Sequence, residues 1–371
     1  MARGTLLSEV LSAPEDAAEF FAFAEREGWG DGLPLVPPTE ARVQAMLEAT
    51  PLAPSRLLGR IEPRRGAATV EKVAINAVLA GCTPDAFPAV LAAVECVLDP
   101  AFNLYALATT TCCATPALMI NGPARRALGI ECGYSCLGTN GRANATIGRA
   151  LRLVLRNVGG ALPGAVSKSC FGQPGRISLC FGEWEERSPW PPFHVRRGFA
   201  SEESVMTATC ATGTQDIADI FAESAEELVD VLAHAIDWVG NNKVLVPQAE
   251  GDLLLLLCPD FADKIARDGW SVEDVQRRLA EQTRTPVERW PRSLWPKLEE
   301  RGFLEADGTV PLVASPEQFL IAVAGGESGH HAISFCTFGL TWTVSRRFSL
   351  EPAPLDRGES CDLPAGPREP R

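Results

Sequence analysis

Five consecutive leucines, Leu253–Leu257, constrain the fold of this chain more than any other segment. A short apolar run without polar alternation is typical of a strand that is buried on both faces. Such strands occur in parallel sheets covered by helices on each side, and this run is far too short to cross a membrane. Helical patterns follow the run at 260–267 and 271–282. The segment therefore predicts an α/β fold.

The same alternation of helical stripes and short apolar runs continues along the chain. We expect helices at 14–27, 39–47, 69–81, 85–98, 144–158, 224–239, 260–267 and 271–282. We expect short buried strands at 104–108, 117–120, 177–181, 204–209, 253–257, 310–313 and 319–323. The pattern predicts a two-lobed α/β protein with short buried strands and flanking helices.

Changes in pattern divide the chain into four parts. Residues 1–66 form a helical and loop-rich lead, and residues 67–245 a main α/β lobe. Residues 246–348 form a second α/β lobe, and the core-forming pattern stops at 349–371, which predicts a disordered tail.

Composition excludes several classes of partner. The 371 residues carry a formal net charge of −13, which argues against a nucleic-acid or membrane partner, because both would require a basic face. The N-terminal residues lack the pattern of a signal peptide, so we expect a cytoplasmic protein. Its twelve cysteines are then thiols, and they include neither a CxxC pair nor the Cys/His spacing of a structural zinc site.

Several strings together resemble a known bacterial family. They are DGLPLVPPT at 31–39, ATVEKVAINA at 68–77, RANATIGR at 142–149, SPW at 188–190 with HV at 194–195, and AGG at 324–326 with GH at 329–330. The chain resembles a poorly characterised family that is often encoded beside, or fused to, small proteins with a UGSC or CGSC motif. The resemblance implies a shared fold, thiol or selenol redox chemistry and a small thiol or selenol redox protein as a partner. This chain has no CGSC string itself, and the resemblance transfers no catalytic residue to it.

Thiols in glycine-rich, polar surroundings form the first candidate site. Its four cysteines are Cys112, Cys113, Cys132 and Cys136. A reactive thiol needs a lowered pKa, which a helix N-terminus or nearby cations such as Arg142 and Arg149 would provide. The sequence therefore predicts a thiolate nucleophile or a redox pair. The alternative is that all four are small residues in tight packing.

The start of the helix that follows predicts an anion pocket. Asn144 is expected to cap this helix, whose free N–H groups attract anions together with Arg142 and Arg149. Asn140, in the preceding loop, completes the predicted set of ligand-binding residues. The alternative is an ordinary helix cap with surface arginines.

Two histidine-containing loops are further candidates. His194 follows Glu183 and Glu185 in a rigid, aromatic segment and could serve with them in acid/base catalysis, although such segments are also simple connectors. Gly325 and Gly326 follow an apolar strand, where α/β proteins often bind ligands, and His330 is a candidate metal ligand or proton shuttle in that loop.

These candidates leave three hypotheses open. The first is a cysteine-dependent enzyme that acts on a small anionic metabolite by redox chemistry or by carbon–heteroatom bond cleavage. The second is an acid/base lyase or hydrolase that uses His194, Glu183, Glu185 and His330, with or without a metal. The third is a non-catalytic subunit that binds a ligand for a redox partner. The sequence gives no cofactor, metal, substrate, reaction type or oligomeric state.

Overall fold

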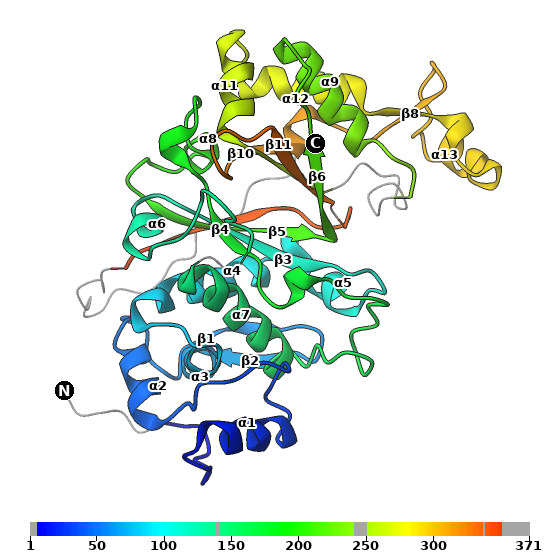
Figure 1. The fold of residues 1–371 in the computed structure, drawn as a ribbon. Helices are drawn as coiled ribbons and strands as arrows, with labels where there is room; N and C mark the ends of the chain where they lie inside the picture. The colour runs from blue at the N-terminus through cyan, green and yellow to red at the C-terminus, as the bar shows by residue number, and fades with distance from the viewer. Residues whose placement is uncertain (1–5, 139–140, 241–250, 337, 351–371) are drawn as a thin grey trace, which may run out of the picture.

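The computed structural model describes residues 6–138, 141–240, 251–336 and 338–350. It confirms the α/β class. Two four-stranded sheets face each other at the centre of the molecule, and helices cover the outer face of each sheet (Figure 1). The molecule therefore has four layers, in the order helices, sheet, sheet, helices.

The first sheet contains the strand order β12–β5–β3–β4. These strands are β12 (Val344–Phe348), β5 (Ser204–Ala211), β3 (Thr115–Asn121) and β4 (Cys180–Gly182). β3 runs parallel to β4, whereas β5 is antiparallel to both of its neighbours. All seven residues of β3 are buried, as expected for the middle of a covered sheet.

The second sheet contains the strand order β10–β7–β11–β6. These strands are β10 (Phe319–Val323), β7 (Leu253–Leu257), β11 (His331–Cys336) and β6 (Gly213–Ala218). β7 and β10 are parallel, and every leucine of β7 is buried, so the predicted doubly buried strand is confirmed. β6 directly follows β5 in sequence, while β12 returns to the first sheet, so the sheets are not two consecutive segments.

The alternate leucines of β7 explain why the run is continuous. Leu254 and Leu256 join the core between the two sheets, where the rings of Phe181 and Phe335 stack with centroids 5.7 Å apart. The other three leucines of β7 join the core beneath the outer helices. Each face of the strand thus meets a different apolar layer.

Three helices build the layer behind the first sheet: α3 (Val70–Ala80), α4 (Phe87–Leu98) and α7 (Arg142–Asn157). Thr69 caps α3 by accepting from the Lys72 N–H, and Gly81 ends it in the left-handed region, at φ 88°. α4 packs on β5 and β12 and is buried almost all round. The elements further out are α1 (Ala17–Arg26), α2 (Glu40–Leu47), β1 (Leu57–Ile61) and β2 (Gly66–Thr69).

Three other helices cover the second sheet: α9 (Ala225–Ile236), α11 (Pro259–Arg267) and α12 (Val272–Gln282). Ser271 and Asp274 form a capping box at the start of α12, a helix that the sequence predicts at 271–282. The remaining elements are α5 (Leu104–Thr109), α6 (Pro123–Ala127), α8 (Phe193–Arg196), α13 (Trp295–Glu300), β8 (Arg284–Pro286) and β9 (Thr309–Pro311).

One predicted strand is wrong. Residues 104–108 belong to the helix α5, because Asn103 adopts a left-handed conformation, at φ 50°, and its side chain accepts from the Ala106 N–H. Leu104, Leu107 and Ala108 face the core from one side of this helix. A short apolar run has no periodicity that distinguishes a buried helix from a strand.

No single helix within the described ranges is long and apolar enough to cross a bilayer. The segments Pro84–Leu98 and Pro100–Thr109 reach that length and composition only as a pair, bent by 71°.

Candidate functional site

The carboxyl ends of parallel strands from both sheets meet at one edge of the molecule. The Trp184 N–H, just after β4, donates to the Val323 carbonyl at the end of β10, over 2.7 Å. The Gly325 N–H donates to the Cys132 carbonyl over 2.8 Å. This edge is where α/β proteins commonly bind ligands, and it brings the predicted thiol, histidine and glycine loops together.

A cluster of one histidine and two carboxylates lies at this edge. One possible ligand atom from each of Glu183, Glu185 and His194 lies within 4.8 Å of the others. His194, on α8, is completely buried, and neither its Nδ1 nor its Nε2 atom has a hydrogen-bond partner. A neutral imidazole has one donor and one acceptor, so burying both without partners is costly, by about 1–3 kcal/mol for each atom.

Glu183 is completely buried beside this histidine. Its Oε2 atom accepts from Asn121 Nδ2 at 2.5 Å and from the Phe193 N–H at 2.7 Å. Its Oε1 atom and the Asn121 Oδ1 atom are both buried without a partner. Burial raises the pKa of Glu183 to about 7, although Arg196 and the two hydrogen bonds favour the ionised form.

Glu185 connects the cluster to solvent. Its Oε1 atom accepts from the Gly122 N–H at 2.6 Å and from Asn121 Nδ2 at 3.1 Å, and the side chain is 16% exposed. Asn121 therefore contacts both carboxylates from the end of β3, and this strand end fixes their spacing.

The unpartnered atoms have the chemistry of metal ligands. They comprise an imidazole nitrogen, a carboxylate oxygen and an amide oxygen, and Glu185 adds a second carboxylate at the solvent side. Ligand atoms on one cation with bonds of ~2.1 Å lie about 3.4 Å apart in tetrahedral geometry, so the side chains of this cluster would move closer together to bind one. Mixed imidazole and carboxylate ligands suit a first-row transition metal ion better than calcium or magnesium.

Arg125 joins this cluster to one of the predicted thiols. Its side chain is 7% exposed, and its Nη1 atom donates to Cys132 Sγ at 3.3 Å. Its Nη2 atom pairs with Glu186, and its Nε atom lies 4.0 Å from Glu185 Oε1 without a hydrogen bond. Gly182 is required here, because a Cβ atom would lie 2.8 Å from Arg125 Cδ.

The two thiols at this edge are buried rather than activated. Burial raises the pKa of Cys136 to about 11, with a further rise from Cys132. Burial also raises the pKa of Cys132, and Arg125 offsets this only in part. The structure therefore provides neither residue with the lowered pKa that thiolate catalysis requires.

The other two predicted thiols lie at the opposite end of β3. Cys113 Sγ donates to the Thr212 carbonyl at 2.8 Å, and burial raises the pKa of Cys112 to about 11. Both cysteines precede β3, whereas Cys132 and Cys136 follow it. The four cysteines thus form two separate pairs, and only one pair adjoins the histidine and carboxylate cluster.

The predicted cap of α7 is wrong. Gly141 is the N-cap, and Asn144 lies inside the first turn at 1% exposure. Its side chain exchanges hydrogen bonds with the backbone of Glu131, over 2.9 and 3.0 Å, and donates to the Cys136 carbonyl at 3.4 Å. Asn144 therefore holds the loop of residues 131–136, the cysteine loop, in place. Its amide makes three hydrogen bonds to the backbone of this loop instead of capping its own helix.

The predicted anion-binding arginines are engaged with the protein. Arg142 donates to the Gly81 carbonyl at 2.9 Å. Arg149 pairs with Asp31 at 2.7 Å and donates to the Leu33 carbonyl. Asn140 lies outside the described residues.

The glycine loop packs against the cysteine loop. A Cβ atom on Gly326 would lie 2.2 Å from Tyr134 Cδ1, so only glycine fits, and Tyr134 Oη donates to the Glu327 carbonyl at 3.1 Å. His330 is exposed, and its ring centroid is 6.5 Å from that of Phe261. The loop thus shapes the edge, while His330 lies outside the cluster of possible metal ligands.

Two residues of the site were missed in the sequence. Asn121 ends a buried strand, and Arg125 follows it in α6. A polar residue directly after an apolar strand is a recognisable signal, because such positions line ligand sites in α/β folds. Neither Asn121 nor Arg125 lies in a known sequence motif.

Comparison with protein-family models and with curated proteins finds no match to this chain. The family resemblance of its sequence strings therefore stays a prediction.

Proposed function

We propose that this protein is a metal-dependent enzyme in which Glu183, Glu185 and His194 hold a first-row transition metal ion. The buried, unpartnered ring nitrogens of His194 carry this proposal. A metal ion would provide a partner for one ring nitrogen of His194, for Glu183 Oε1 and for Asn121 Oδ1. When bound, such an ion polarises a substrate oxygen or lowers the pKa of a bound water.

The surroundings favour an anionic substrate. Arg125 and Arg126 lie beside Glu185 and Glu186, and the charge of Arg196 acts on Glu183. With a divalent cation bound, positive charge exceeds the charge of the nearby carboxylates, so the site would attract a small anion. The Arg125 Nε–H is buried without a hydrogen-bond partner, so a substrate oxygen that reached it would gain a hydrogen bond.

The reaction class is hydrolysis or elimination. In hydrolysis, water adds across the bond that breaks; in elimination, a proton and a leaving group depart from neighbouring atoms. Glu185 is the member of the cluster with access to solvent, so water and substrate would approach the ion from its side. Asn121 acts as a positioning residue, because it orients both carboxylates from the end of β3.

Metal content and melting temperature test this proposal. Purified protein, dialysed after incubation with Zn²⁺, Mn²⁺ or Fe²⁺, should retain about one ion per chain by elemental analysis. The ion should stabilise the fold by about 4 kcal/mol at a thousandfold excess over Kd. Glu183→Gln and His194→Ala should abolish both effects.

Two matched controls separate the site from the rest of the surface. Glu186→Gln removes a neighbouring carboxylate outside the cluster, and His330→Ala removes a histidine in the adjoining loop. Both variants should bind the ion like the original protein. If the folded protein retains no ion and its melting temperature is unchanged, the metal-dependent function is wrong.

A second candidate function is supported by the contact between Arg125 and Cys132. A guanidinium favours the thiolate form, so Cys132 is the cysteine best placed for a thiol-dependent reaction beside the same substrate. Cys132→Ser would then abolish turnover and leave the metal content unchanged. Loss of turnover in Glu183→Gln with full activity in Cys132→Ser would favour the metal-dependent function.

A further inference from the structure

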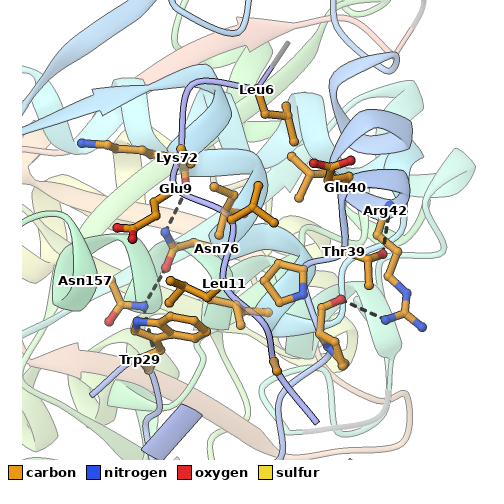
Figure 2. A pocket seen from close by; sticks show the side chains of 18 of the residues that line it. Leu6, Glu9, Leu11, Trp29, Thr39, Glu40, Arg42, Lys72, Asn76 and Asn157 are labelled. Carbon is orange, nitrogen blue, oxygen red and sulfur yellow. Dashed lines mark hydrogen bonds between the residues drawn. The ribbon is translucent and has the colours of Figure 1, made fainter. Parts of the chain in front are cut away.

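A cavity lies among the outer helices of the N-terminal part of the chain, away from the histidine and carboxylate cluster. It has a volume of about 740 Å³ and is bounded by residues 6–15, α1, α2, α3 and the end of α7 (Figure 2). Apolar side chains from separate segments line it: Leu11, Phe20, Trp29, Val43, Ile75 and Leu79. This volume falls within the range of small-molecule binding sites, which is about 300–1,000 Å³.

The wall formed by residues 6–15 is anchored by a buried charge. Glu71, on α3, is 2% exposed, and its carboxylate accepts from the Leu7 N–H at 2.9 Å and the Ser8 N–H at 2.7 Å. Hydrogen bonds to a charged group are stronger than those between neutral groups. These hydrogen bonds therefore fix the segment beside the cavity.

The amide side chains of the cavity and Arg42 already have partners within the protein. Asn157 Nδ2 donates to Asn76 Oδ1 at 2.8 Å and to the Trp29 carbonyl at 3.1 Å. Asn76 Nδ2 donates to the Lys72 carbonyl, and Arg42 donates to the Pro37 carbonyl. None of the lining side chains, all of which are described, has a buried nitrogen or oxygen without a partner. The interior thus offers apolar surface rather than unmet hydrogen bonds.

Apolar side chains of the wall remain open to solvent beside this cavity. Val10 is 67% exposed and Leu11 is 44% exposed. At the margins, Figure 2 shows Lys72 and Glu9 on one side and Glu40 and Arg42 on the other. The margins therefore carry both signs of charge, which suits a polar but uncharged end group.

From these features we infer that the cavity binds a small molecule with an alkyl chain and an uncharged polar end group. The chain would cover Val10 and Leu11 and fill the apolar interior, and the end group would lie at the charged margin. This inference does not depend on the proposed metal site, since the two share no residue.

A series of straight-chain alcohols provides the test. Hexanol, octanol and decanol should be titrated into the full-length protein by calorimetry. Because apolar burial dominates, the Kd should fall about fourfold for each added CH₂ group. A Kd that does not change with chain length, or no binding of decanol, would overturn the inference.

Three substitutions test whether decanol binds in this cavity. Ile75→Trp fills the cavity and should weaken decanol binding at least tenfold, while Ile177→Trp, at a position 52% exposed elsewhere, should leave it unchanged. Glu71→Gln releases the wall and should also weaken binding. Melting curves should verify that each variant is folded, and equal affinities in all three folded variants would show that decanol binds elsewhere.

Discussion

Buried polar groups surround both ends of β3, but they have hydrogen-bond partners at the amino end and several lack them at the carboxyl end. At the amino end, Cys113 donates to the Thr212 carbonyl, and Gln173 donates to the carbonyls of Cys113 and Ala211. At the carboxyl end, atoms of Asn121, Glu183 and His194 are buried without partners. Reactive residue types therefore do not identify a site by themselves, and the proposed metal site is based instead on the group of neighbouring unpartnered atoms.

The largest expected difference is between the alkylation rates of the cysteines near the two ends of β3 and the rate of an exposed cysteine. At pH 7.5, a thiol with a pKa of about 11, as for Cys112 and Cys136, should be alkylated some hundredfold more slowly than an unperturbed one, because its thiolate fraction is smaller. The substitution Cys361→Ser removes the one cysteine that lies outside the described residues. In this background, the exposed Cys170 should react first with iodoacetamide. Peptide mass spectrometry over time measures each rate.

The pH dependence separates the two ends of β3. As pH rises from 8 to 10, alkylation of Cys112 should increase about tenfold per unit, because its raised pKa keeps it protonated over this whole range. Cys136, at 4% exposure, should stay slow until the protein opens. Rapid modification of Cys136 at pH 7.5 would instead favour a thiol-dependent enzyme.

Removing the Asn144 side chain should disturb the carboxyl end alone. Asn144→Ala leaves the Glu131 N–H and two carbonyls without their partner, so the free energy of unfolding should fall by about 3 kcal/mol. Alkylation of Cys136 should accelerate, and that of Cys112 should not. Denaturant unfolding measures the first effect, and Arg142→Ala, an exposed control, should cost less than about 1 kcal/mol.

The smallest expected effect concerns whether Arg149 is available to bind an anion. Burial alone would raise the pKa of Asp31, but Arg149 outweighs it and the net shift is downward. A lowered pKa in the folded state stabilises the fold above pH 4, and this contribution disappears as pH falls through the folded value. Asp31→Asn should therefore cost about 1 kcal/mol at pH 7 and nothing near pH 2.

Urea unfolding at both pH values measures this difference. Asp263→Asn removes a more exposed partner of Arg187 and should cost less than about 0.5 kcal/mol at either pH. An equal cost of Asp31→Asn at pH 7 and pH 2 would mean that the ion pair does not hold Arg149, which would then be available to a ligand.

Local patterns predicted much of the fold. The capped helices α3 and α12 and the leucine strand β7 follow from periodicity and from residues such as Thr69 and Ser271. The pairing of β12 with β5 does not, because it joins residues far apart in sequence and no local pattern specifies that partner.

The candidate site was only partly predictable for the same reason. Glu183, Glu185 and His194 stand close together in one segment, so their proximity could be anticipated. Asn121 and Arg125 reach them through the parallel pairing of β3 with β4. The sequence predicts Asn144 as a helix cap because asparagine strongly prefers such positions, but in the structure its hydrogen bonds to the backbone of Glu131 override that preference.

The return of β12 to the first sheet has a consequence for how the protein is made. Until residues 344–348 emerge from the ribosome, β5 has an unpaired edge and the apolar side of α4 lacks one of its covers. Synthesis from Ala211 to Val344 takes roughly ten seconds, during which that edge can pair with another chain. Nascent chains should therefore engage chaperones until the last strand is in place, and truncation before Val344 should yield aggregates rather than a smaller soluble domain.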